Sequence, residues 1–196
     1  MRFPVALGSG LGEACPGCGG PTAADPEPYA TFGAREATPW PPRGAPVAAL
    51  LDNVRSVQNV GSMFRTADGV GLQHMHLAGF TPPPTHPAMA KTSLGAEQTV
   101  PWTLHRDGAA AAAQLRAEGH RLWALEGGPA ATPWFAALAE REGPPIVVVV
   151  GHEVSGIDPR ILSCCERVLA LPMLGLKGSL NVSVAFGVAV YSLRFG

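Results

Sequence analysis

From residue 47 to the C-terminus, short apolar runs alternate with longer stretches that have a helical periodicity. The apolar runs predict strands at residues 47–51, 73–78, 121–125, 146–150 and 168–171, with a further short strand around 98–102. Residues 107–118 and 134–141 carry alanine, leucine and charged residues in a helical rhythm. Strands that alternate with helices indicate an α/β domain with a mainly parallel sheet. The all-apolar run 146–150 is then expected to be a central strand covered by helices on both faces.

Residues 1–46 are crowded with proline and glycine and show neither the strand period nor the helix period. We therefore predict an appendage over residues 1–46 and one α/β domain over residues 47–196. The sequence Gly8-Ser-Gly-Leu-Gly12 is similar to the start of a dinucleotide-binding loop, but such a loop must open a helix. The chain continues instead into Cys15-Pro-Gly, which opposes a helix, so a plain glycine loop is favoured.

The four cysteines form two pairs, Cys15 with Cys18 and Cys164 with Cys165. The first pair has the knuckle form that turns two thiolates toward one zinc ion, but a structural zinc site needs four ligands. Two alternatives stay open: a zinc site completed from elsewhere in the chain or from another subunit, and a metal-free loop. The adjacent second pair is expected to be two buried small side chains. Because no secretory signal precedes the cysteines, a reducing cytoplasm is favoured over a disulfide framework.

The chain has 196 residues, of which 46% are hydrophobic, and its formal net charge at pH 7 is -1. This length supports one well-buried core. The balance of charge excludes a strongly basic surface that would hold nucleic acid by charge alone, so any such site must be local. The longest uninterrupted apolar run, residues 144–150, is too short for a bilayer span, which takes about 20 residues. The composition therefore predicts a soluble protein.

Three segments that follow predicted strands carry residues suited to ligand binding. In the first, Asn59 is expected to cap a helix that ends at Gly69 or Gly71. Arg65 lies one turn beyond Gly61, so the glycine would leave room for a phosphate-sized ligand beside the guanidinium. A solvated arginine on a helix surface is the plain alternative.

The second segment, residues 151–156, is a glycine-bracketed loop at the carboxyl end of the central strand, the edge at which open α/β sheets bind ligands. Glu153 is a candidate acceptor of hydrogen bonds from a sugar, a base or Arg65. An ordinary turn would also explain the pattern. Asp158 followed by Pro159 predicts the start of a helix.

The third segment, residues 172–178, precedes a helix that Ser179 is suited to cap. The backbone amides of this loop would enclose an uncharged ring such as adenine. Ser179, Ser183 and Gly187 form a stripe of small residues that permits close packing of a second backbone. The alternative is a buried helix with polar residues in its first turn.

Taken together, the segments closely resemble the three motifs of the SpoU (TrmH) family of SPOUT RNA methyltransferases, in the family's order and at similar separations. The match covers about residues 47–196. The matching patterns are Asn59-x-Gly61-x-x-x-Arg65-x-Ala67 for motif one, Gly151-x-Glu153-x-x-Gly156 for motif two, and Pro172-Met-x-Gly175 with Ser179-Leu-Asn-Val-Ser-Val-Ala185 for motif three.

The resemblance implies an α/β fold whose C-terminal part is threaded into a deep trefoil knot, with S-adenosylmethionine (AdoMet) held in the knot and a homodimer as the working unit. Spacing alone does not predict a knot, because threading is nearly absent from ordinary folds. By matching position, the catalytic residues would be Arg65, Asn59, Glu153, Ser179 and Asn181. The cofactor-binding residues would be Leu125, Glu126, Gly127, Gly151, Leu171, Met173, Gly175, Ser179 and Leu180. Since the arginine of dimeric members reaches the other subunit's cofactor, residues 59–65 are expected to serve the neighbouring site.

The implied reaction is attack of a ribose 2'-hydroxyl of tRNA or rRNA on the methyl group of AdoMet, without a metal ion. The protein must align the reacting groups and have the hydroxyl proton removed. Two routes stay open: the site deprotonates Arg65, which then accepts the proton, or Arg65 orients the hydroxyl and an RNA phosphate accepts it. Candidates for contacts with the RNA are Arg43, Arg55, Lys91 and Lys177.

Two other functions compete with this one. A noncatalytic RNA-binding or assembly factor would keep the fold, but all the matched catalytic residue types are present. A nucleotide-binding enzyme of the conventional Rossmann type would need a functional glycine loop at residues 8–12 and none of the later motifs. That function fits the sequence worst.

Overall fold

The computed structural model describes residues 12–23, 40–129 and 131–196. The chain divides into two units, Met1–Pro39 and Trp40–Gly196. A seven-stranded parallel sheet forms the centre of the larger unit. The sheet order is β3-β2-β1-β6-β4-β7-β5. The strands are β1 Val47–Asp52, β2 Met75–Ala78, β3 Trp102–His105, β4 Arg121–Leu125, β5 Thr132–Pro133, β6 Ile146–Val150 and β7 Arg167–Ala170.

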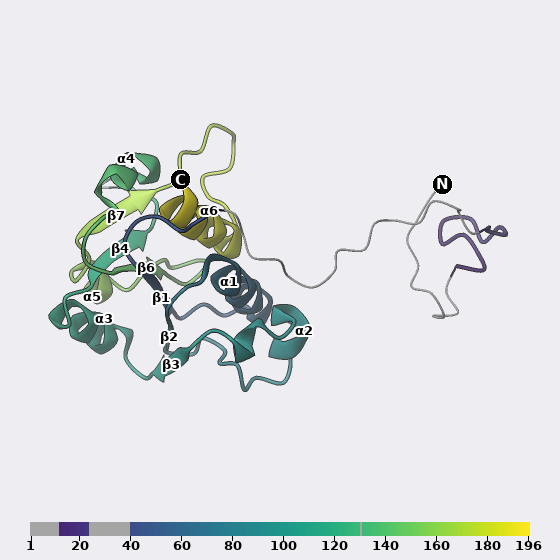
Figure 1. Cartoon of the computed structure of the whole chain (residues 1–196), viewed down its shortest axis with the longest axis horizontal. Helices are drawn as coiled ribbons and strands as arrows, with labels where there is room; N and C mark the ends of the chain where they lie inside the picture. Colours follow the sequence, from purple (N-terminus) through teal and green to yellow (C-terminus); the bar gives the residue numbers. More distant parts are fainter. Residues whose placement is uncertain (1–11, 24–39, 130) are drawn as a thin grey trace. The chain divides into compact units, whose positions relative to one another are not determined.

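Helices cover both faces of the sheet, as Figure 1 shows. One apolar core lies between the sheet and helices α1, α2, α4 and α6, and a second lies between the sheet and helices α3 and α5. The α-helices are α1 Val57–Val70, α2 Met89–Ser93, α3 Gly108–Ala117, α4 Trp134–Ala137, α5 Pro159–Leu162 and α6 Val182–Phe195; short 3-10 helices span Ala96–Gln98 and Leu138–Glu140. The α/β class with a parallel sheet is confirmed.

The central strand β6 is buried at all five positions, as its apolar sequence predicts. It lies between β1 and β4, both parallel to it. The prediction of a strand around residues 98–102 is wrong. A 3-10 helix occupies Ala96–Gln98, and β3 begins only at Trp102. The local reason is that Thr99 and Val100 donate their backbone N–H groups back to the carbonyl of Ala96, which keeps this stretch turned.

The ends of α1 and α6 differ from the expected ones. Ser56 caps α1 and accepts a hydrogen bond from the backbone N–H of Asn59, so the prediction of Asn59 as the cap is wrong. Asn181 caps α6 through the N–H of Ser183, so Ser179 lies ahead of the cap instead. The end of α1 at Gly71, in a left-handed conformation, and the Asp158 cap before Pro159 are confirmed. The side chain of Asn59 is thereby left for long-range contacts.

Glycines of α1 and α6 serve helix packing. A Cβ atom at Gly61 would lie 1.9 Å from Thr92 Oγ1, so this glycine makes room for α2 and not for a phosphate, which corrects the expectation. A Cβ atom at Gly187 would lie 3.9 Å from Thr66 of α1, an ordinary contact distance. Gly187, one member of the predicted stripe of small residues, therefore faces α1 of the same chain.

The cysteines have contrasting environments. Cys164 and Cys165 are partly buried beside the second core, and burial, followed by the neighbouring Cys164, raises the pKa of Cys165 to about 12. In the smaller unit, Cys15 and Cys18 lie in a turn closed by the hydrogen bond from Cys15 N to Gly20 O. Residues 8–11 of the glycine-rich sequence lie outside the described residues. Among the helices that the structure describes, none is both long and apolar enough to span a membrane.

Candidate active site

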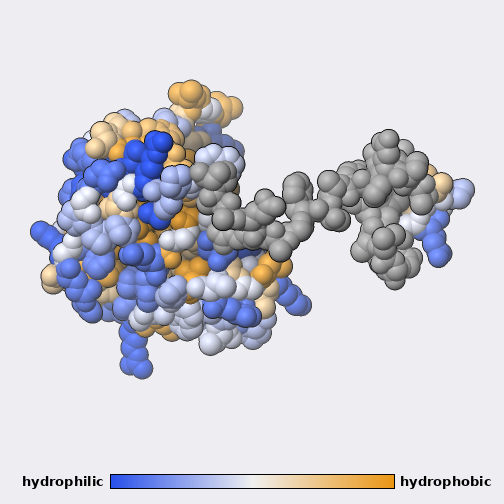
Figure 2. Space-filling view, viewed as in Figure 1, coloured by the Kyte–Doolittle hydropathy of each residue, from blue (hydrophilic) through white to orange (hydrophobic). Residues whose placement is uncertain are grey.

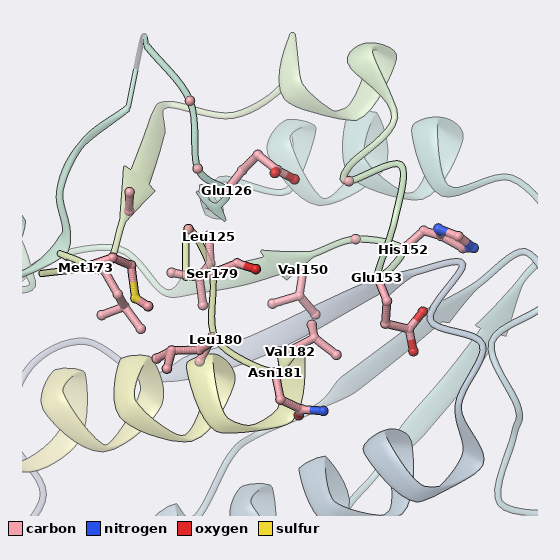
Figure 3. Close-up of a pocket in the computed structure, with 18 of the residues that line it drawn as sticks. Leu125, Glu126, Val150, His152, Glu153, Met173, Ser179, Leu180, Asn181 and Val182 are labelled. Atoms are coloured by element: carbon pink, nitrogen blue, oxygen red, sulfur yellow. The ribbon is translucent and has the colours of Figure 1, made fainter. Parts of the chain in front are cut away.

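A cavity of about 560 Å³ lies at the carboxyl ends of β4, β6 and β7, the edge of the sheet expected to bind ligands. Figure 3 shows the loops that enclose it and the start of α6. The lining residues are Leu125, Glu126, Gly127, Gly128, Val150, Gly151, His152, Glu153, Val154, Gly156, Ala170, Leu171, Met173, Gly178, Ser179, Leu180, Asn181, Val182 and Ala185.

The loop after β6 folds tightly against itself because of its two glycines. His152 and Gly156 exchange both backbone hydrogen bonds. A Cβ atom at Gly151 would lie 2.4 Å from backbone atoms of Gly156 and Ile157, closer than side chains approach. Gly156 has a φ of +74°, in the left-handed region that favours glycine. The glycine-bracketed pattern is therefore required by the backbone of the cavity wall.

Glu126 ties the loop after β4 to the loop after β6. Its Oε2 atom accepts a hydrogen bond from the backbone N–H of Ile157 at 3.0 Å. Within the described part of the chain, its other oxygen, Oε1, has no hydrogen-bond partner, and Glu126 lines the cavity. This oxygen is available to a ligand hydroxyl or amine.

Glu153, at the rim of the cavity, accepts hydrogen bonds from the first predicted segment. Its Oε2 atom accepts from the backbone N–H of Arg55, and its Oε1 atom from the N–H of Ser56, both at 3.2 Å. The amide Nδ2 of Asn59 also donates to Oε1, at 3.1 Å. Of the candidate donors to Glu153, a sugar, a base or Arg65, the last is not among these three groups.

Asn59 joins the first and third segments. Its Oδ1 atom accepts a hydrogen bond from Asn181 Nδ2 at 3.1 Å. Asn181 Oδ1 in turn accepts from the N–H and the hydroxyl of Ser183, at 2.9 and 2.7 Å. The hydrogen-bonded series Glu153–Asn59–Asn181–Ser183 thus links the three segments at the rim of the cavity within one chain.

These contacts determine the charge of Glu153. Partial burial by itself would raise the pKa of this carboxyl, but hydrogen bonds from the backbone N–H groups of Glu153, Arg55 and Ser56 and from the amide of Asn59 outweigh burial. The net pKa of Glu153 lies below its usual value, so the side chain is a carboxylate at neutral pH. A carboxylate held in this way orients its neighbours and is a weak proton acceptor.

The loop between β7 and α6 forms the remaining wall of the cavity. Its side chains Leu174 and Leu176 are fully exposed, and Figure 2 shows apolar side chains projecting where this loop lies in Figure 1. Met173, Gly178 and Ser179 line the cavity, whereas Gly175 does not. The tip of the loop therefore points away from the cavity that its two ends enclose.

Arg65 lies apart from the cavity, on the exposed surface of α1. Helix α1 packs against α6, and a Cβ atom at Gly187 of α6 would lie 3.9 Å from Thr66, the residue that follows Arg65. The cavity therefore brings together all the predicted site residues except Arg65, Asn59 and Gly175, and Asn59 is attached to it through Glu153 and Asn181.

Sequence reasoning missed several cavity residues, of which His152 is the most informative. It follows Gly151 directly and lines the cavity beside Glu153. The motif pattern leaves the position of His152 unspecified. Its place between the two glycines, directly after a strand end that was expected to bind a ligand, was the signal that could have identified it. The cavity is also lined by apolar residues near the ends of strands and at the start of α6, where the sequence indicated only core packing: Val150, Ala170, Val182 and Ala185.

Comparison with known proteins identifies the family. Residues 46–191 match the model of the SpoU rRNA Methylase family. The chain belongs to this family. It is 30% identical over 147 residues to the 23S rRNA (guanosine(2553)-2'-O)-methyltransferase RlmP of Bacillus subtilis, covering 74% of this chain and 56% of that protein. Against the tRNA (guanosine(18)-2'-O)-methyltransferase of Escherichia coli the identity is 28% over 148 residues, covering 76% and 62%.

A solved relative shares the fold. The SpoU methyltransferase AviRb from Streptomyces viridochromogenes, in complex with AdoMet, superposes with a TM-score of 0.68 at 21% identity, covering 77% of this chain and 60% of that one. At this identity the likeness shows the fold alone. The chain spans a little more than half the length of the curated relatives it matches.

The described side chains contain no group of three or more His, Cys, Asp or Glu residues arranged to hold a metal ion. Cys15 and Cys18 are both free thiols, and the two alternatives for them, a zinc site completed from elsewhere in the chain or from another subunit and a metal-free loop, stay predictions.

Proposed function

We propose that the chain is an AdoMet-dependent RNA methyltransferase that transfers a methyl group to a ribose 2'-hydroxyl. The observation that carries the proposal is the hydrogen-bonded chain from Glu153 through Asn59 to Asn181, at the rim of a cavity at the carboxyl edge of a parallel sheet. Membership of the SpoU rRNA methylase family and relatives named as 2'-O-methyltransferases of rRNA and tRNA support it.

The cavity fits AdoMet in size and in chemistry. Small-molecule sites are about 300–1,000 Å³, apolar for the most part, with a few polar groups. Leu125, Leu171 and Leu180 offer apolar walls to an adenine ring, and the free oxygen of Glu126 offers an acceptor to a hydroxyl or amine. Gly127 and Gly178 have open space where a side chain would stand, which leaves their backbone accessible to the ligand. When bound, AdoMet supplies an electrophilic methyl carbon.

The residues of this chain align the reacting hydroxyl. Glu153 and Asn181 hold Asn59 from two sides, so hydrogen bonds within the protein join the three segments. A preorganised rim of this kind helps to position the reacting hydroxyl oxygen about 3–3.5 Å from the methyl carbon. Since Glu153 is a weak base, Arg65 or a phosphate of the RNA is left to receive the hydroxyl proton.

The working unit proposed here is a homodimer in which Arg65 acts on the partner's cavity. Val184, Val188 and Tyr191 are exposed along one face of α6, and an exposed apolar stripe of this kind favours burial in an interface. Helix α1, which carries Arg65, packs against α6 on the same side of the sheet. If two subunits pair across this face, the guanidinium of Arg65 in one subunit would lie closer to the cavity of the other.

The activity is tested by incubating purified protein and methyl-labelled AdoMet with tRNA and with rRNA, followed by mapping of the labelled ribose. The expected result is label on a 2'-oxygen of one RNA class. Arg65→Ala is expected to lose the label while keeping AdoMet affinity, whereas the control Arg116→Ala, an exposed arginine of α3, is expected to keep both. Folded protein that binds no AdoMet would instead favour a noncatalytic factor.

The composite site is tested by mixing subunits. Arg65→Ala and a variant with a blocked cavity, Ser179→Trp, are each expected to be inactive. After random mixing, half of the dimers are mixed and each of those has one complete site, so about a quarter of the activity should return. No recovered activity would place Arg65 at the cavity of its own chain, and a monomer in analytical ultracentrifugation would contradict the homodimer.

A further inference from the structure

An exposed phenylalanine adjoins the cavity without contributing to the chemistry described above. Phe80, which follows β2, is 60% exposed. Its ring meets the ring of His152 edge to face, with 6.1 Å between the ring centroids and an interplanar angle of 86°. His152 lines the cavity and precedes Glu153 in the chain. An aromatic surface therefore continues outward from the rim of the cavity.

The backbone of Phe80 is held firmly, so the exposure of its side chain is built into the fold. The N–H of Phe80 donates to Asn53 Oδ1, and both Asn53 and Gly79 have positive φ values, of 56° and 64°. A Cβ atom at Gly79 would lie 2.0 Å from that same Oδ1, so only glycine fits there. The buried Thr81 hydroxyl donates to the carbonyls of Leu51 and Ala78.

The ring of His152 is held as well. Its Nδ1 atom accepts hydrogen bonds from the backbone N–H groups of Val154 and Ser155, both at 3.1 Å. An Nδ1 atom that accepts carries no proton, so the proton of the neutral ring lies on Nε2. The Phe80 ring, carried by an anchored backbone, thus contacts a His152 ring that two hydrogen bonds hold in place.

We propose that Phe80, supported by His152, forms a binding site for an unpaired base of the substrate RNA, next to the ribose that receives the methyl group. The proposal rests on the proposed function and adds to it a contact with the RNA. Proteins bind unpaired bases by stacking them on aromatic side chains, and every base offers a face suited to this. An aromatic side chain on an anchored backbone makes such a contact at a reduced cost in conformational entropy.

The position of the surface favours RNA over the cofactor as its occupant. Phe80 is not among the residues that line the cavity, so a ligand filling the cavity leaves this ring exposed. Arg55, whose side chain is exposed, is anchored to Glu153 through its backbone N–H and offers a cation for an adjacent phosphate. A base on Phe80 and a phosphate near Arg55 would flank the hydroxyl at Glu153.

The test compares Phe80→Ala with Phe135→Ala, a matched control in α4, where the phenylalanine is 49% exposed. The dissociation constant for a fluorescent unpaired RNA oligonucleotide and that for AdoMet are measured on the same samples. Phe80→Ala is expected to weaken oligonucleotide binding about 5- to 100-fold. Binding of AdoMet and of a fully paired RNA duplex should stay unchanged. Phe80→Trp should restore oligonucleotide binding, and Phe135→Ala should leave every value unchanged.

Each other outcome overturns the proposal. Equal oligonucleotide affinity in Phe80→Ala and the wild type would show that no base stacks there. A parallel loss of AdoMet affinity would assign the ring to the cofactor, and a changed oligomeric state would assign it to a subunit contact. Because these are binding measurements, they remain informative if the wild type methylates no RNA, a result that would refute the proposed function alone.

Discussion

Replacement of Glu153 by glutamine tests whether its carboxylate holds the three segments together. Glutamine keeps the size of the side chain but exchanges one acceptor oxygen for an NH₂ donor. With its oxygen in the Oε1 position, the hydrogen bonds from Ser56 N and Asn59 Nδ2 are kept. The NH₂ group then faces the backbone N–H of Arg55 across the 3.2 Å now spanned by a hydrogen bond. One charge-assisted hydrogen bond is lost and two donors oppose each other.

The magnitude follows from these contacts. A hydrogen bond to a charged group contributes about 1.5–3 kcal/mol, but solvent reaches the exposed Glu153, so we discount the loss in free energy of unfolding to about 1 kcal/mol. The catalytic effect is expected to be larger, about 10- to 100-fold in kcat, because the rim is displaced from its aligned geometry.

The stability difference between the wild type and Glu153→Gln is expected to depend on pH. The pKa of Glu153 in the folded chain lies below its usual value of 4.5. Its stabilising contribution is therefore full above pH 4.5 and is lost as the pH falls through the folded pKa. Glutamine does not titrate, so the difference between the two proteins should narrow in acid.

Urea unfolding at about pH 7 and about pH 4 measures the difference, with Glu142→Gln, an exposed glutamate outside the cavity, as the control. Glu153→Gln should unfold at lower urea than the control at neutral pH. Identical midpoints at neutral pH, or a difference that is undiminished in acid, would refute the reasoning.

Three further changes probe the cavity and the sheet. Gly151→Ala is expected to cost about 1–3 kcal/mol and to weaken AdoMet binding, because the new methyl group would lie 2.4 Å from backbone atoms of the same loop; an unchanged Tm and an unchanged Kd in calorimetry would contradict this. Ser179→Trp is expected to block the cavity mouth and abolish AdoMet binding without a change in Tm, since Ser179 is exposed; retained affinity would place the cofactor elsewhere. Burial and the charges of neighbouring histidines lower the pKa of His76 from 6.5 to about 4, so the wild type should lose stability as the pH falls from 6.5 toward 4, and His76→Gln should lose less. Thermal melts across this range test the last prediction, and parallel curves for the two proteins would refute it.

The errors of the sequence-based expectations have a common physical origin. Ser56 and Asn59 are both suited to cap a helix, and so are Ser179 and Asn181; in each case the sequence offers two polar residues and the structure uses one as the cap. In the first pair, the side chain that is not the cap is held by distant residues. Asn59 bonds with residues 94 and 122 positions away, and no local pattern encodes partners at such separations.

The sequence by itself determined the α/β class, the central strand at Ile146–Val150, the Asp158 cap and the positions of the three motifs. These features depend on neighbouring residues, because strand and helix periods and caps are local. Only the tertiary structure decided that Gly61 makes room for Thr92, that Asn59 lies between Glu153 and Asn181, and that Phe80 meets His152. The reason is the strand order: β6 lies between β1 and β4, which brings the ends of strands far apart in sequence to one edge of the sheet.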